Sequence, residues 1–96
     1  MALKVVDDTY TKGTHILFRR MGVSDSGKTL RFDVIADEDS LWLGRVEWFG
    51  RWRKYVFVAG SLTLYEETCL NEIAEFIKGK TAEHRQAAKA AKGAKA

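Results

Sequence analysis

The segment of residues 41–58, LWLGRVEWFGRWRKYVFV, constrains the fold of this chain more than any other. It contains all three tryptophans of the sequence, with cationic side chains between and beside them. Apolar and polar residues alternate on both sides of Phe49-Gly50, a pattern that predicts a β-hairpin. The cationic side chains of this segment are Arg45, Arg51, Arg53 and Lys54.

The register of this hairpin is predicted from the requirement that the apolar side chains of both strands lie on the same, buried face. A three-residue loop, Phe49-Gly50-Arg51, sets Trp48 opposite Trp52, whereas a two-residue loop mixes the apolar and charged faces. In the chosen register Glu47 faces Arg53, and Trp42 faces Val58. We therefore expect Trp42, Trp48 and Trp52 to pack together in the core beneath a helix, because each indole ring buries a large area.

The remaining elements follow from periodicity. Residues 15–20 and 29–36 alternate as strands, and residues 1–13 are ambiguous. Apolar residues recur at helical spacing from Glu67 to Lys78, with Gly79 expected as the residue after the helix end. The fold class is therefore α+β: a four- or five-stranded antiparallel sheet with one C-terminal helix packed on a face. Residues 1–80 are expected to form a single domain, and residues 81–96 a basic Ala/Lys-rich tail that is partly helical or disordered.

The charge distribution argues against a protein that is basic throughout. The whole chain has a net charge of +3. Residues 78–96 carry six Lys or Arg side chains and one glutamate, a net charge of +5, which leaves −2 for residues 1–77. A cationic binding site must therefore be local, at the hairpin or in the tail.

No motif for a reaction, a metal or a membrane is found. Residues 22–29 match the spacing of a phosphate-binding P-loop, but a P-loop leads into a helix, and the segment after Lys28 alternates as a strand. Cys69 is the only cysteine, and a small buried side chain is the better interpretation than a nucleophile. With only His15 and His84 beside it, no metal site is expected. We expect no enzyme, no cofactor, no leader peptide and no membrane contact.

Two motifs resemble a family of small, uncharacterised bacteriophage and prophage proteins. The family pattern is a Leu-Gly-x-Val-x-Trp-x-x-x-Trp-Arg-x-Tyr hairpin followed by a Cys-Leu-x-x-Ile-Ala-x-Phe helix. The matching residues are Leu43, Gly44, Val46, Trp48, Trp52, Arg53, Tyr55, Cys69, Leu70, Ile73, Ala74 and Phe76. The resemblance implies a phage accessory protein that acts in the cytoplasm of a bacterial host. It implies no particular activity.

The candidate site is the charged side of the hairpin. Guanidinium and ammonium groups bind phosphates, and neighbouring aromatic rings stack on bases. The chain is therefore expected to bind nucleic acid there, assisted by the basic tail. An ordinary solvated strand face remains the competing interpretation. The candidate residues are Arg45, Phe49, Arg51, Arg53, Lys54 and Tyr55.

A second functional class stays open. The chain could instead be an anti-defence or host-takeover protein that binds a host protein or sequesters a nucleotide signal. Phe49 at the hairpin tip could then belong to an interface, including one between copies in a homo-oligomer, because an exposed apolar ring at a turn is costly unless something covers it.

Overall fold

The computed structural model describes residues 3–6, 9–24 and 27–94, with side chains to residue 90. Two short N-terminal strands are β1 (Lys4–Val5) and β2 (Tyr10–Lys12). The longer strands are β3 (Ile16–Val23), β4 (Leu30–Ala36), β5 (Trp42–Phe49) and β6 (Lys54–Ala59). One helix, α1 (Glu67–Ala94), follows them.

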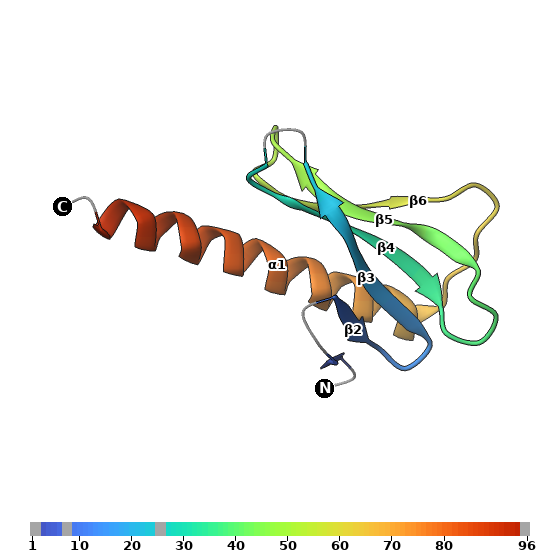
Figure 1. Ribbon diagram of the computed structural model, residues 1–96. Helices are drawn as coiled ribbons and strands as arrows, with labels where there is room; N and C mark the ends of the chain where they lie inside the picture. The colour runs from blue at the N-terminus through green and yellow to red at the C-terminus, as the bar shows by residue number, and fades with distance from the viewer. Residues whose placement is uncertain (1–2, 7–8, 25–26, 95–96) are drawn as a thin grey trace.

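The strands form one antiparallel sheet in which each strand pairs with the next along the chain, in the order β1-β2-β3-β4-β5-β6 (Figure 1). The α+β class is confirmed. The expected four or five strands are corrected to six, because the ambiguous residues before Gly13 form β1 and β2. Lys4 and Val5 pair with Lys12 and Thr11, a ladder too short to give a clear alternating pattern.

The core lies between one face of the sheet and α1. Phe18, fully buried on β3, stacks on Phe76 of α1 with ring centroids 4.0 Å apart and an interplanar angle of 5°. Phe32 of β4 meets the Phe76 ring edge-on at 4.9 Å. Inward and outward side chains alternate along β3 and β4, as expected for residues 15–20 and 29–36. This alternation directs the rings of Phe18 and Phe32 toward α1. The buried residues of the core are Ile16, Phe18, Phe32, Val34, Leu43, Val46, Tyr55, Ile73 and Phe76.

The helix begins where expected but does not end at Gly79. The Glu66 carboxylate accepts a hydrogen bond of 2.7 Å from the Cys69 amide, which satisfies a free N–H of the first turn. Gly79 lies inside α1, which continues without a break to Ala94. Beyond it, the Thr81 hydroxyl accepts a hydrogen bond from the Tyr55 amide at 3.1 Å, so contacts with β6 hold the helix past the glycine. Whether residues 81–96 act as a separate tail stays a prediction.

Glu72 of α1 contacts the turn between β2 and β3 at the edge of the core. One carboxylate oxygen of Glu72, a residue 3% exposed, accepts a hydrogen bond of 2.6 Å from the Thr14 amide in the β2–β3 turn. A Cβ at Gly13 would approach the Glu72 carboxylate to 2.4 Å, so the turn passes close over this side chain. A charged side chain of α1 thereby ties the helix to the N-terminal edge of the sheet.

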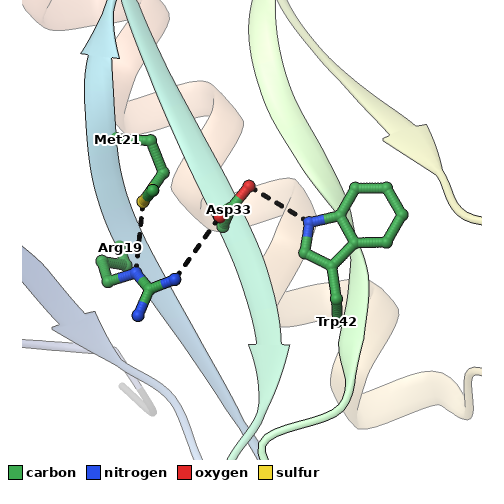
Figure 2. A network of polar contacts seen from close by, with 4 residues as sticks. All are labelled: Arg19, Met21, Asp33 and Trp42. Carbon is green, nitrogen blue, oxygen red and sulfur yellow. Dashed lines mark hydrogen bonds and ion pairs between the residues drawn. The ribbon is translucent and has the colours of Figure 1, made fainter.

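Trp42 is not in the core. The β4–β5 ladder shifts register between Val34 and Ile35, and this irregularity turns Leu43 inward and Trp42 outward. The Trp42 ring is 44% exposed, and its Nε1 donates a hydrogen bond of 3.1 Å to Asp33. Figure 2 shows this network on the face of the sheet opposite α1, where Asp33 also pairs with Arg19 at 3.6 Å. The expectation of three clustered indoles is wrong for this ring.

A strained residue follows β6. Leu62 has a φ of 57° and a fully exposed side chain, so it adopts the left-handed conformation without gaining burial. We expect Leu62→Asn to raise the free energy of unfolding by about 0.5–1 kcal/mol, because asparagine tolerates this conformation better. Chemical denaturation followed by circular dichroism measures the change. A loss of stability of about 1 kcal/mol would show instead that the leucine contributes a contact.

Candidate functional site

The hairpin between β5 and β6 ends in an exposed tip, residues 49–54. The four residues 50–53 separate the strands, and the Trp52 amide donates a hydrogen bond to the Phe49 carbonyl at 3.1 Å. The Phe49 and Trp52 rings meet edge-to-face with centroids 4.9 Å apart and an interplanar angle of 85°. Phe49 is 37% exposed and Trp52 is 62% exposed. The tip therefore presents two aromatic rings to solvent.

This turn corrects the expected register. Trp48 lies opposite Tyr55, and Phe49 opposite Lys54, instead of Trp48 opposite Trp52. The loop is one residue longer than expected, which exchanges the inward and outward positions of β6. Arg53 is the last residue of the turn and has a φ of 53°, in the left-handed region. Arginine is not a residue type that indicates this conformation in a sequence. Trp52 is consequently a tip residue and not a core residue.

Tyr55 is also corrected, from an exposed stacking ring to a core residue. It is 3% exposed, and its hydroxyl oxygen accepts a hydrogen bond of 3.0 Å from the Leu30 amide. Burial raises the pKa of the Tyr55 phenol above its ordinary value, so the group stays neutral well beyond physiological pH. A base cannot stack on a ring in this position.

Arg45 lies on the opposite face of the sheet from α1 and is separated from the tip by Glu47. The Arg45 guanidinium forms an ion pair with the Glu47 carboxylate of the same strand. The structure thus does not bring Arg45 together with the other candidate side chains, and its charge is already compensated.

Three candidate cations remain at the tip. Arg51, Arg53 and Lys54 are exposed. Among the described residues, no carboxylate lies within ion-pair distance of any of them. A cation that is already paired with a carboxylate of the same chain attracts a phosphate group only weakly, whereas these three are not paired in this way with any described residue.

The helix adds cations that the sequence placed only in a tail. The Arg85 guanidinium donates a hydrogen bond of 3.3 Å to the Arg53 carbonyl, which fixes this part of α1 against the tip. The Trp48 ring packs between sheet and helix, with its centroid 4.3 Å from that of His84. The high helical propensity of residues 80–90 favours a helix that continues this far. Gly79 was expected to follow the helix end, so the sequence did not predict the contact of these residues with the tip.

The tip and α1 enclose two adjacent hollows that share Arg85, and together we call them the cationic groove. No acidic side chain lines either hollow. The first is lined by Trp48, Arg53, His84, Arg85, Ala88 and Lys89. The second is lined by Lys54, Ile77, Lys78, Thr81, Ala82 and Arg85. The arrangement joins an aromatic tip to a track of cations, a combination whose groups are able to pair with phosphates and stack on planar rings.

Other residues with reactive or ligating groups show no comparable arrangement. Cys69 is half-buried against the core, and burial raises the pKa of its thiol, which disfavours the nucleophilic thiolate. Lys28 and Thr29 lead into strand β4, so the P-loop interpretation fails as expected. In the part of the chain described, no group of three His, Cys, Asp or Glu side chains could hold a metal ion. No helix in that part is long and apolar enough to cross a membrane.

Comparison with known proteins gives one informative similarity. The chain is 34% identical over 59 residues to a protein of Acholeplasma phage L2 described as an uncharacterised 9.3 kDa protein. The match covers 62% of this chain and 76% of the phage protein. No protein-family model and no solved structure matches the chain.

Proposed function

Because the chain belongs to the same family as the uncharacterised 9.3 kDa protein of Acholeplasma phage L2, we propose that it is a phage accessory protein that binds single-stranded nucleic acid. It acts in the cytoplasm of a bacterial host and catalyses no reaction. The observation that carries the proposal is the exposed Phe49–Trp52 ring pair beside a groove that is lined by cations and lacks acidic side chains.

The geometry favours an unpaired strand over a duplex. Bases must be unstacked from their neighbours before an aromatic side chain can stack on them, and single strands offer such bases freely. In this arrangement Trp52 and Phe49 stack on bases. Arg53, Arg85 and Lys89 contact the phosphates that follow along the groove. Arg45 and Tyr55 take no part.

The test is a titration of a fluorescent single-stranded oligonucleotide at two salt concentrations. Contacts with three phosphates give a slope of about −2 in a plot of log affinity against log salt concentration, since each phosphate contributes about −0.7 for single strands. An absence of binding at low salt would end the proposal. Tighter binding of a duplex of the same length would contradict the role of the exposed rings.

Trp52→Ala provides the sharper measurement. We expect this change to weaken oligonucleotide binding by about 5- to 150-fold, because a base–aromatic stack is worth roughly 1–3 kcal/mol. The matched control is Trp42→Ala, which removes the other exposed indole from the sheet face opposite α1. Equal losses in the two variants would show that binding does not depend on the tip.

A second candidate function uses the same groove. The hollow beside the Trp48–His84 pair, lined also by Arg53, Arg85 and Lys89, favours a free nucleotide as an alternative ligand. The chain would then be an anti-defence protein that sequesters a nucleotide signal. Calorimetry with mononucleotides and short oligonucleotides separates the two: sequestration requires tighter binding of the mononucleotide, and strand binding requires affinity that grows with length.

A further inference from the structure

The linker between β6 and α1 exposes leucines at the end of the molecule away from the cationic groove. Leu64 is 93% exposed, Leu62 is fully exposed, and Leu41 in the neighbouring β4–β5 connection is 56% exposed. The three side chains line a single hollow whose floor includes Leu43 and Cys69. Fully exposed leucines in a linker gain nothing from folding of a single copy, and grouped apolar side chains of this kind mark an interaction site.

The rim of this hollow is acidic, and we call it the acidic hollow. Glu38, Asp39 and Glu66 line it, and the His15 imidazole lines the hollow as well. Among the described residues, no cation lies within ion-pair distance of these three carboxylates. The hydrogen bond from the Cys69 amide holds the pKa of Glu66 below its ordinary value, which favours the charged form of this carboxylate. An apolar floor with an uncompensated acidic rim fits a segment that is basic and has small or apolar side chains.

The chain carries such a segment at its opposite end. The β4–β5 connection and the β6–α1 linker lie at one end of the molecule, and the C-terminal turns of α1 project past the sheet at the other (Figure 1). Residues 86–90 of these turns are exposed and combine Lys89 with alanines, and Lys92 follows in the sequence. Alanine side chains allow a helix to approach an apolar surface closely, while the ammonium group of Lys89 can meet carboxylates.

We propose that the acidic hollow binds the C-terminal turns of α1 from a second copy of this chain. The two surfaces differ, so the contact is head-to-tail, and a pair joined by one contact keeps one hollow and one helix end available for further copies. Such a contact produces open arrays, a closed ring or, where two antiparallel copies exchange helix ends reciprocally, a two-fold dimer. The proposal does not depend on nucleic-acid binding, and its test contains no nucleic acid.

The test is sedimentation velocity on the nuclease-treated full chain at about 0.05 M and about 0.5 M salt, conditions that shorten the screening length from roughly 14 Å to roughly 4 Å. We expect the weight-average sedimentation coefficient to rise with protein concentration at low salt and to fall toward that of a single copy at high salt. A single copy at both salt concentrations would overturn the proposal.

Two charge reversals identify the surfaces. Glu38→Lys changes the hollow and Lys89→Glu changes the helix end, and each variant alone should remain a single copy at low salt. Mixed in equal amounts, the two should associate again, because every hollow then finds a helix end of opposite charge in the other variant. Association of either variant alone at the wild-type level would overturn the assignment, as would a mixture that stays dissociated.

Leu62→Asn distinguishes loss of the contact from loss of the fold. This exposed substitution relieves a left-handed leucine, so the variant should remain folded by circular dichroism while its association weakens. Unchanged association would contradict a role for the exposed leucines. Association abolished by Trp42→Ala and insensitive to salt would instead assign the contact to the uncovered sheet face and overturn the proposal.

Discussion

Phe18→Ala should lower the free energy of unfolding by about 3–5 kcal/mol, the range observed when a large aromatic side chain is removed from a core. Phe18 has no exposed surface and stacks on Phe76 at 4.0 Å, so the change leaves a cavity between the sheet and α1. Domains of this size are stable by roughly 5–15 kcal/mol, so the variant should be only marginally folded. Urea denaturation followed by far-ultraviolet circular dichroism measures the loss.

Phe49→Ala is the matched control for this prediction. It removes the same side chain from the hairpin tip, where the ring is 37% exposed and contacts Trp52. We expect a loss below about 1 kcal/mol, since surface substitutions usually have small effects. If the free energy of unfolding of Phe18→Ala lies within about 1 kcal/mol of the wild-type value, the attachment of the helix does not depend on this stack.

Reversing two charges in the cationic groove should have the largest effect on binding. We expect Arg53→Glu combined with Arg85→Glu to weaken single-stranded oligonucleotide binding by about 100-fold at low salt. Both guanidinium groups line the same hollow, and each reversal replaces attraction to a phosphate by repulsion. The salt slope should become shallower by about 1.4, because two phosphate contacts of about 0.7 each are lost. Fluorescence anisotropy over a series of salt concentrations gives both quantities.

The control for this pair changes the net charge equally at distant positions. Lys4→Glu combined with Arg45→Glu alters β1 and the sheet face opposite α1, neither of which lines the groove. We expect a reduction of less than about 10-fold, from long-range electrostatics alone. If both double variants weaken binding to the same extent, the affinity reflects overall charge and the groove has no special role.

The cationic tip shows how much of the candidate site is readable from the sequence. Phe49, Arg51, Arg53 and Lys54 were predicted by their place in an alternating hairpin, and the structure leaves all four side chains exposed. Tyr55 was assigned to the wrong face because a turn one residue longer reverses every position that follows it. The contribution of Arg85 could not be predicted, since it depends on a helix that continues past Gly79.

The tryptophans show the same limit for the core. Only Trp48 packs between sheet and helix, against Tyr55 and His84. Trp42 is turned outward by the register shift in the β4–β5 ladder, and Trp52 lies in the turn. The expectation that all three rings are buried holds only for Trp48, because an irregularity of one residue in the ladder and the length of the turn decide which rings reach the core.

The sequence by itself determined the α+β class, the approximate positions of β3, β4, β5 and β6 and the start of α1, because alternation and helical spacing are local properties of the chain. Only the tertiary structure decided the hairpin register, the length of the helix and the meeting of Arg53 with Arg85. These depend on which side chains find partners across the sheet–helix interface, and such long-range contacts outweigh a turn preference or a single glycine worth about 1 kcal/mol.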